Sequence, residues 1–415
     1  MKKFLSIVLI SVFAVVLVSS DRYLLRSEKI IFEINSYCSL STEEEIEKEL
    51  EDVNNITLQI KLDYDDFNYA YEDMETASNE EIEAYRASLR EAGAQYHYNN
   101  NLEFSDEFEK TTYDNKYISK YTPYVEYQYS KDEFVSDDYF VLRYISNCEY
   151  VDLIYVEESA KQYQEQLINT IYQVGAEDYI NNNEGDGTGI NVGILEVGIM
   201  DKNHPNIAGS NFLIRDEWYF IETVEDHTTV VGSIIGGNTG IAKGARLLSV
   251  EIAGTPNSEV DWLLDNNVHI INMSFADDWD YGVYNSTTAY MDYVVKTYKV
   301  TCVAAAGNNN DGNYKVGNPG LGYNIITVGA FSGRFYRLPF SSYVEVTGPD
   351  KPTLCAPGSS IVIPNFDFQS GTSIATAVTS GLLALVFEEY PDLKVNPEKA
   401  VSLITATAIP YEDYP

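Results

Sequence analysis

From Ile190 to the end of the chain, short apolar segments alternate with segments that have helical periodicity. The apolar segments are continuous, which is typical of strands buried on both faces of a parallel sheet. Helices between them supply the crossovers that parallel strands need. The pattern predicts an α/β fold with a mainly parallel central sheet. Its expected strands are 191–195, 246–252, 268–273, 300–305 and 325–328, and its expected helices follow His227, lie near 260–265, follow Ser373 and span 396–407.

Residues 21–160 show a different pattern and are predicted to form a separate, small α+β domain without a catalytic pattern of its own. A capping box predicts a helix from Ser41 to about Asp52, and a second helix is expected from Asn79 to Ala92, ending at Gly93. His97 stands among tyrosines and asparagines and is predicted to be solvated. Strands are expected where apolar and polar residues alternate, at 29–35, 56–63, 124–130, 139–145 and 152–156, with 124–130 paired to 139–145.

The N-terminus has the pattern of an export signal. Two lysines precede an apolar run over residues 4–18, and two serines follow it. This pattern predicts a signal peptide over residues 1–20, cleaved after Ser20. The alternative is an uncleaved membrane anchor. Both alternatives put the rest of the chain outside the cytoplasm, so we expect a secreted or cell-surface protein.

Net charge and cysteine content limit which binding partners, disulfides and metal sites we expect. The formal net charge of −37 at pH 7 disfavours nucleic acid, and membrane contact is expected only if the N-terminal segment stays uncleaved. Cys38 and Cys148 could form a disulfide in an oxidising compartment. Cys302 and Cys355 are predicted to be buried free thiols. The spacing of cysteines and histidines indicates no metal site.

Four polar side chains border the predicted strands and helices in an order that suits acyl transfer. Glu196 ends a strand, His227 heads a helix, Asn308 follows a strand, and Ser373 precedes an Ala-rich helix. Polar residues at the carboxyl edge of a parallel sheet can meet in one site. There a histidine can take the serine proton, a carboxylate can orient the imidazole, and an amide can bind the oxyanion. Ser373 by itself would be interpreted as a helix cap.

Seven segments, in chain order, resemble motifs of the subtilisin-like serine proteases (subtilases). The resemblance covers about residues 172–410. It implies a subtilisin-like three-layer sandwich with a mainly parallel central sheet, over residues 190–415. The segments are 190–199 with 203–207 (V-x-V-L-D-T-G-I…H-P-x-L), 227–237 (H-G-T-H-V-A-G-T-I-A-G), 240–246 (G-V-A-P-G-A-K), 271–275 (I-N-M-S-L), 305–308 (A-A-G-N), 356–358 (A-P-G) and 371–376 (G-T-S-M-A-T).

The resemblance implies a role for each matching residue. Ser373 would be the nucleophile and His227 the general base and acid. Asn308 would bind the oxyanion together with the Ser373 N–H, and Glu196 would complete the triad. The residues implied to line the substrate site are Ser274, Phe275, Ala276, Ala304, Ala305, Ala306 and Gly307.

One position departs from the family pattern at the proposed site. The family has aspartate where this chain has Glu196, which carries the same charge on a longer side chain. Ser-His-Glu triads occur on other folds, so the substitution is compatible with catalysis. Asp201 and Asp226 are the alternative acids near in sequence.

By the same resemblance, residues 21–160 are a prodomain that assists folding, covers the site with its last strand and is then cut off by the enzyme itself. Residues 161–189 are the expected linker and processing region, with the cut between Glu158 and Gly175. The chain ends soon after its last predicted helix, where family members usually add a closing segment. We therefore expect a fragment or a trimmed catalytic domain.

These observations predict an exported serine endopeptidase that hydrolyses peptide bonds through an acyl-enzyme and processes its own prodomain. Its expected partners are a protein or peptide substrate and that prodomain. No cofactor is expected; calcium sites are common in the family, but no ligand set is identified. The alternative is a subtilase fold without turnover that binds peptides or a partner. The intact Ser373, His227 and Asn308 favour the enzyme, and Glu196 favours the alternative.

Overall fold

The computed structural model divides the 415-residue chain into two compact units. The first contains residues 1–69 and 91–161, and the second contains residues 70–90 and 162–415. The structure describes residues 55–62, 74, 77–108, 116–121, 123–130, 151–158, 185–215, 223–252, 254–276, 282–308, 315–331, 337–343, 349–359, 361, 363, 366 and 369–408.

Several sequence-based predictions lie outside the described residues. They concern the signal peptide or anchor over residues 1–20, the strands 29–35 and 139–145, the helix from Ser41 to Asp52, most of the linker 161–189, and the disulfide between Cys38 and Cys148. All of these stay predictions.

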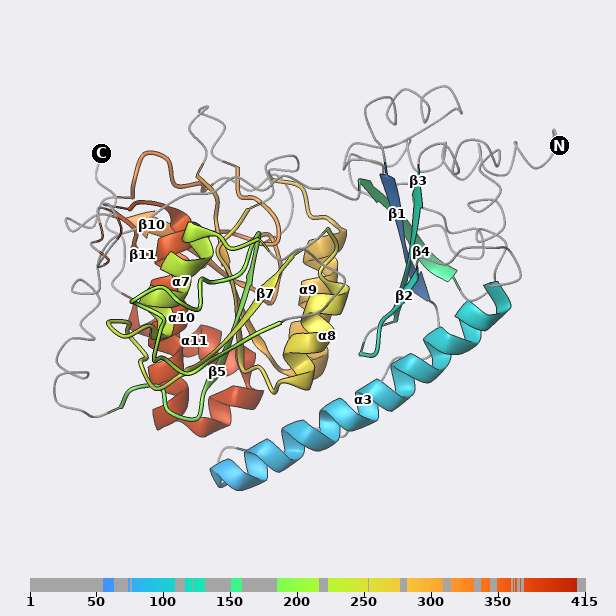
Figure 1. The fold of residues 1–415 in the computed structure, drawn as a ribbon, viewed down its shortest axis with the longest axis horizontal. Coiled ribbons are helices and arrows are strands. Elements are labelled where there is room, and N and C mark those ends of the chain that lie inside the picture. The colour runs from blue at the N-terminus through green and yellow to red at the C-terminus, as the bar shows by residue number, and fades with distance from the viewer. Residues whose placement is uncertain are drawn as a thin grey trace. The chain divides into compact units, whose positions relative to one another are not determined.

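The first unit contains a four-stranded antiparallel sheet with the strand order β2-β3-β1-β4 (Figure 1). β1 lies between β3 and β4, with Leu58 opposite Tyr127 on one side and opposite Val156 on the other. The strands predicted at 56–63, 124–130 and 152–156 are confirmed. The four strands are β1 (Asn55–Leu62), β2 (Lys116–Ile118), β3 (Tyr124–Ser130) and β4 (Val151–Glu158).

Helix α3 (Asn79–Phe108) starts at the predicted residue but does not end at Gly93. At its start, Ser78 and Glu81 exchange hydrogen bonds as a capping box, with Ser78 N–H donating to Glu81 Oε2 over 2.7 Å. A glycine costs a helix only about 1 kcal/mol, and burial of the neighbouring Ala94 offsets that cost. The prediction that His97 is solvated is also wrong: it is buried within α3, and burial lowers its pKa to about 3.

The second unit contains the predicted parallel sheet. Its described strands follow the order β11-β10-β9-β8-β5-β7-β6, and every neighbouring pair is parallel. The five predicted strands are confirmed, and two short edge strands, β6 and β11, are additional. The strands are β5 (Asn191–Glu196), β6 (Phe212–Ile214), β7 (Arg246–Glu251), β8 (Ile270–Met273), β9 (Thr301–Ala305), β10 (Ile326–Phe331) and β11 (Leu354–Pro357).

Helices cover both faces of this sheet, with α7 and α10 on one face and α8 and α9 on the other (Figure 1). α10 is Ala-rich and buried on nearly every side, because it packs on α7 as well as on the sheet. In α7, a Cβ added at Gly232 would lie 2.2 Å from Met200 Sδ. The close approach of Met200 to the α7 backbone therefore needs a glycine at this position. The helices are α7 (Asp226–Gly236), α8 (Asn257–Asp265), α9 (Ser286–Tyr298), α10 (Thr372–Glu389), the 3₁₀ helix η3 (Pro391–Val395) and α11 (Pro397–Thr407).

Among the described residues, no helix combines the length and the apolar composition that crossing a membrane requires. The helix predicted near 260–265 is α8 and that predicted at 396–407 is α11, so both are confirmed. Helix α9 was not predicted, since it is rich in tyrosine and threonine. It begins with a side-chain cap, in which Asn285 accepts a hydrogen bond from the Thr288 N–H.

Candidate active site

The carboxyl edge of the second unit's sheet collects the polar residues that the sequence singles out. Glu196 is the last residue of β5, and His227 is the second residue of α7. Asn308 follows β9, and Ser373 is the second residue of α10. β5, β8 and β9 are neighbours in the sheet, so their carboxyl ends lie side by side. Parallel strands thus bring together residues that are far apart in the sequence.

Glu196 is fully buried and lies between β8 and His227. Its Oε1 accepts a hydrogen bond from the Ser274 N–H over 2.5 Å. Its Oε2 lies 3.6 Å from His227 Nδ1, which is within ion-pair range but longer than a hydrogen bond. Asp201 instead accepts a hydrogen bond from Asn203 N–H within its own loop. Of the three candidate acids, Glu196 is therefore the one that the structure brings to the histidine.

A buried polar network underlies this carboxylate, and its centre is Asn272 on β8. The Asn272 side chain donates to Ser274 Oγ over 2.9 Å and to Glu196 Oε1 over 3.4 Å. It accepts from Ser380 Oγ over 2.9 Å. Ser274 Oγ in turn donates to the carbonyl oxygen of Ser373 over 2.7 Å. The network fixes Glu196 and the start of α10 to the same strand.

Sequence reasoning missed the role of Asn272, although a signal was present. The residue is an amide inside the strand segment Ile270–Met273, whose other members are apolar, and it is fully buried. A buried amide must find hydrogen-bond partners or destabilise the fold. Such a residue in a core strand indicates a polar network next to it.

The segment after β9 is tied to the start of α10 by two hydrogen bonds. Thr372 N–H donates to Asn308 Oδ1 over 2.8 Å, and Gly307 N–H donates to Thr372 Oγ1 over 3.2 Å. A backbone N–H can only donate, so Oδ1 faces the helix and Nδ2 is the opposite end of the amide. Gly307 has φ of 103°, a conformation that residues with a Cβ rarely adopt. The glycine therefore permits the turn that orients Asn308.

Ser373 lies inside α10 and does not cap it. The cap residue is Gly371, which makes no side-chain cap hydrogen bond, and Thr372 is the first helical residue. The interpretation of Ser373 as an ordinary helix cap is therefore wrong. Ser373 is only 1% exposed. Its position puts its own N–H among the first of the helix, at the positive end of the helix dipole, where developing negative charge is stabilised.

The residues predicted to line the substrate site leave the sheet on two adjacent strands. Met273 of β8 is paired with Ala304 of β9, so the segment 274–276 and the segment 304–307 begin next to each other. The members of both segments are buried, and Ala276, at 9%, is the most exposed of them. Ser274 uses its N–H and its hydroxyl for Glu196 and Ser373. The structure thus joins the predicted lining to the predicted triad, and the lining role itself stays a prediction.

The two described cysteines differ from each other. Cys302 on β9 is a buried free thiol, as predicted, and burial raises its pKa. Cys355 is also free but exposed, so the prediction that it is buried is wrong. The reason is that β11 is an edge strand of the sheet. Within the part of the chain that the structure describes, no group of three histidines, cysteines or carboxylates is arranged to hold a metal ion.

Sequence comparison identifies the family. The model of the Subtilase family matches residues 187–413, and the chain belongs to this family. It is 29% identical over 230 residues to the Thermostable alkaline protease of Halalkalibacterium halodurans, which covers 51% of this chain and 60% of that protein. It is 27% identical over 243 residues to Subtilisin DY of Bacillus licheniformis, which covers 53% of this chain and 85% of that protein.

Solved structures include the Prenylagaramide maturation protease PagA, with 28% identity, a TM-score of 0.48, and coverage of 58% of this chain and 90% of that one. The family match confirms the resemblance predicted from the seven motifs. The parallel sheet with helices on both faces confirms the α/β fold class. The match to the Thermostable alkaline protease spans only 60% of that protein's length, so a whole-protein activity remains a proposal.

Proposed function

We propose that this chain is an exported serine endopeptidase that hydrolyses peptide bonds of proteins or peptides. The observation that carries the proposal is the buried Glu196 carboxylate 3.6 Å from His227 Nδ1, at the sheet edge where α10 presents Ser373. Membership of a family whose matched relatives are named proteases supports the same conclusion. Export is supported by the N-terminal signal pattern and by the name of a related Extracellular serine proteinase from Thermus.

The residues divide the chemistry of acyl transfer between them. Glu196 faces Nδ1 of His227, so Nε2 is the ring nitrogen that takes the Ser373 hydroxyl proton. Ser373 Oγ then attacks the carbonyl carbon of the scissile bond. Asn308 Nδ2 and the Ser373 N–H donate to the oxyanion of the tetrahedral intermediate. In subtilisin, a member of the same family, loss of one such donor costs about 10²–10³ in rate.

Collapse of the intermediate breaks the peptide bond. The imidazolium of His227 gives its proton to the leaving amine, and an ester between Ser373 and the acyl group remains. A water molecule then attacks this ester after losing a proton to His227. The second tetrahedral intermediate releases the carboxylic acid and restores the serine hydroxyl. Glu196 stabilises the positive charge on the imidazole in both halves of the reaction.

Residues 21–160, which contain the four-stranded sheet of the first unit, are proposed to be the prodomain. Its last described strand is β4, so a cut between Glu158 and Gly175 would separate its sheet from residues 190–415, which we call the catalytic unit. Parallel sheets with pairings distant in sequence fold slowly, which is a physical reason for a folding template. Active enzyme would make this cut itself.

One experiment tests the proposed function directly. The purified full-length protein is treated with a fluorophosphonate probe, and its processing is followed by mass spectrometry. We expect labelling at Ser373 and self-cleavage between residues 158 and 175, both abolished in Ser373→Ala. An unmodified protein that is neither labelled nor processed would show that the fold binds peptides or a partner without turnover.

A further inference from the structure

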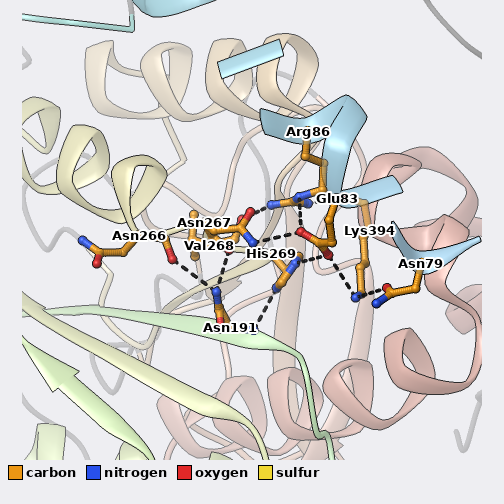
Figure 2. A network of polar contacts seen from close by, with 9 residues as sticks. All are labelled: Asn79, Glu83, Arg86, Asn191, Asn266, Asn267, Val268, His269 and Lys394. Carbon is orange, nitrogen blue, oxygen red and sulfur yellow. Dashed lines mark hydrogen bonds and ion pairs between the residues drawn. The ribbon is translucent and has the colours of Figure 1, made fainter. Parts of the chain in front are cut away.

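The first turns of α3 are joined to the catalytic unit by a cluster of polar contacts (Figure 2). We name this cluster the clasp. The Arg86 guanidinium donates to the carbonyl oxygen of Lys394 over 2.5 Å and to that of Val268. Arg86 is among the largest side chains that are fully buried. The clasp consists of Asn79, Glu83 and Arg86 of α3 with Asn191, Asn267, Val268, His269 and Lys394 of the catalytic unit.

Glu83 joins three groups of the catalytic unit. Its Oε1 lies 3.0 Å from His269 Nε2 and 3.1 Å from Lys394 Nζ, and its Oε2 accepts from Asn267 Nδ2 over 2.9 Å. His269 Nδ1 accepts a hydrogen bond from the Asn191 N–H over 2.8 Å. Because Nδ1 accepts, the ring proton is on Nε2 and points to Glu83. The Glu83 carboxylate thus faces three donors of the catalytic unit, on His269, Lys394 and Asn267.

The catalytic unit needs this helix to satisfy its own buried groups. His269 and Lys394 are 1% and 2% exposed, and their charged or polar ends contact α3. Buried charges persist where they are paired, and buried carbonyl groups need donors. Removal of Glu83 and Arg86 would leave a cation, an imidazole and two carbonyl oxygens to find new partners.

The clasp lies at the amino edge of the sheet. Asn191 begins β5, and His269 immediately precedes β8. The catalytic residues lie at the opposite, carboxyl edge, since Glu196 ends β5 and Ser274 follows β8. Residues 79–90 can therefore stay docked without occupying the edge where a substrate would be cleaved.

We propose that residues 79–90 remain bound to the catalytic unit through the clasp after the chain is cut between β4 and β5, so that the processed protein is a two-chain complex. That the protein makes such a cut itself rests on the proposed function. The contacts of α3 within the clasp span more than 180 residues of chain, and none of them involves the segment that would be cut. Breaking the chain there removes the covalent link and leaves the contacts in place.

Acid should loosen the complex. Burial lowers the pKa of His269 to about 3, with Arg86 acting in the same direction and Glu83 opposing it. Burial raises the pKa of Glu83, but the hydrogen bond from His269, its charge, Asn267 and Arg86 together leave that pKa below its usual value. Lys394 also faces this pair. Both groups release protons on docking, so the docked state loses stability as pH falls from about 6.5 towards 3.

The test uses the full chain with Ser373→Ala, so that the cut does not depend on the protein's own activity. A recognition sequence for a site-specific protease is inserted in the segment 159–184, and the protein is cut with that protease. The fragments are then separated by size-exclusion chromatography at pH 7.5 and pH 4.5, and their Kd is measured after dilution. We expect co-elution at pH 7.5 and a Kd at least tenfold higher at pH 4.5.

Variants assign the retention to the clasp. Arg86→Met and Glu83→Gln should each raise the Kd about 10- to 100-fold, because each leaves buried groups unpaired. Glu80→Gln is the matched control, since Glu80 is exposed on the same helix, and it should leave the Kd within threefold. Fragments that separate at pH 7.5 would overturn the proposal. So would retention that Arg86→Met, Glu83→Gln and acid all leave unchanged.

If Arg86→Met fails to fold, Glu83→Gln and the pH measurement together still test the proposal. Failure of the clasp is distinguishable from failure of the proposed function. Absence of fluorophosphonate labelling would refute the enzyme and leave the clasp intact, whereas fragments that separate would refute the clasp alone.

Discussion

Replacing Glu196 by glutamine tests whether this carboxylate holds His227 in its working state. The change removes the negative charge 3.6 Å from Nδ1 while keeping the length of the side chain. At that distance, with an effective dielectric constant of 20, the attraction between unit charges is about 4–5 kcal/mol. Each 1.36 kcal/mol of lost transition-state stabilisation costs about tenfold in rate. The charge alone is therefore worth about 10³-fold.

The hydrogen-bond pattern makes a second contribution. Ser274 N–H faces Oε1, so the amide oxygen of a glutamine must stay at that position. Its NH₂ group then faces Nδ1 of His227 and forces that nitrogen to accept. The ring proton moves to Nε2, where it prevents the ring from taking the serine proton. Since neutralised triad carboxylates cost about 10⁴ in known cases, we expect Glu196→Gln to slow the enzyme about 10²- to 10⁴-fold.

The second-order rate constant for fluorophosphonate labelling of Ser373 measures this effect without knowledge of the substrate. Asp226→Asn is the matched control, because it removes the same charge next to His227 in sequence. We expect the control to label within threefold of the unmodified protein. A Glu196→Gln protein that folds and labels at the unmodified rate would refute the assignment of Glu196. A loss in Asp201→Asn instead would identify the acid as Asp201.

Two further changes test groups around the site and in the core. Asn272→Ala should destabilise the fold by about 1–3 kcal/mol, because it leaves the hydroxyls of Ser380 and Ser274 without this partner; an unchanged midpoint of chemical denaturation would contradict this. Burial raises the pKa of Glu259 to about 7, with Arg215 opposing the rise, so its contribution to stability is lost as pH increases from about 4.5 to 7. Glu259→Gln should therefore raise the melting temperature at pH 8 relative to pH 5, and an equal shift at both pH values would argue against a buried proton.

The sequence predicts the parallel sheet well because its strands are continuous apolar runs. β5 and β9 are confirmed within a residue of the expected bounds at both ends. The edge strands β6 and β11 are short and partly exposed, so they lack that signal. Gly93 shows the opposite error, since a local signal for a helix end was overridden by the packing of residues on both sides of it.

The site residues are recognisable because each stands at the end of a strand or the start of a helix. Glu196 could be placed by that rule, and the structure brings it to His227. The clasp could not be predicted in the same way. Arg86 contacts backbone carbonyl groups, which any residue supplies, and its partners lie 182 and 308 positions away. A salt bridge requires an oppositely charged residue, which can be recognised in the sequence, whereas a backbone carbonyl partner requires no particular residue type.

The attachment of Glu196 to β8 bears on how the proposed triad accommodates a longer acid. One carboxylate oxygen accepts a hydrogen bond from the backbone of Ser274, and the other faces His227. Both contacts therefore depend on the length of the glutamate side chain. A change of Glu196 to aspartate would withdraw the carboxylate by about 1.5 Å, the length of one carbon–carbon bond. Both contacts would lengthen at once. An aspartate at position 196 would therefore not hold His227 in the same way by itself. It would need β8 or α7 to move closer to restore the two contacts.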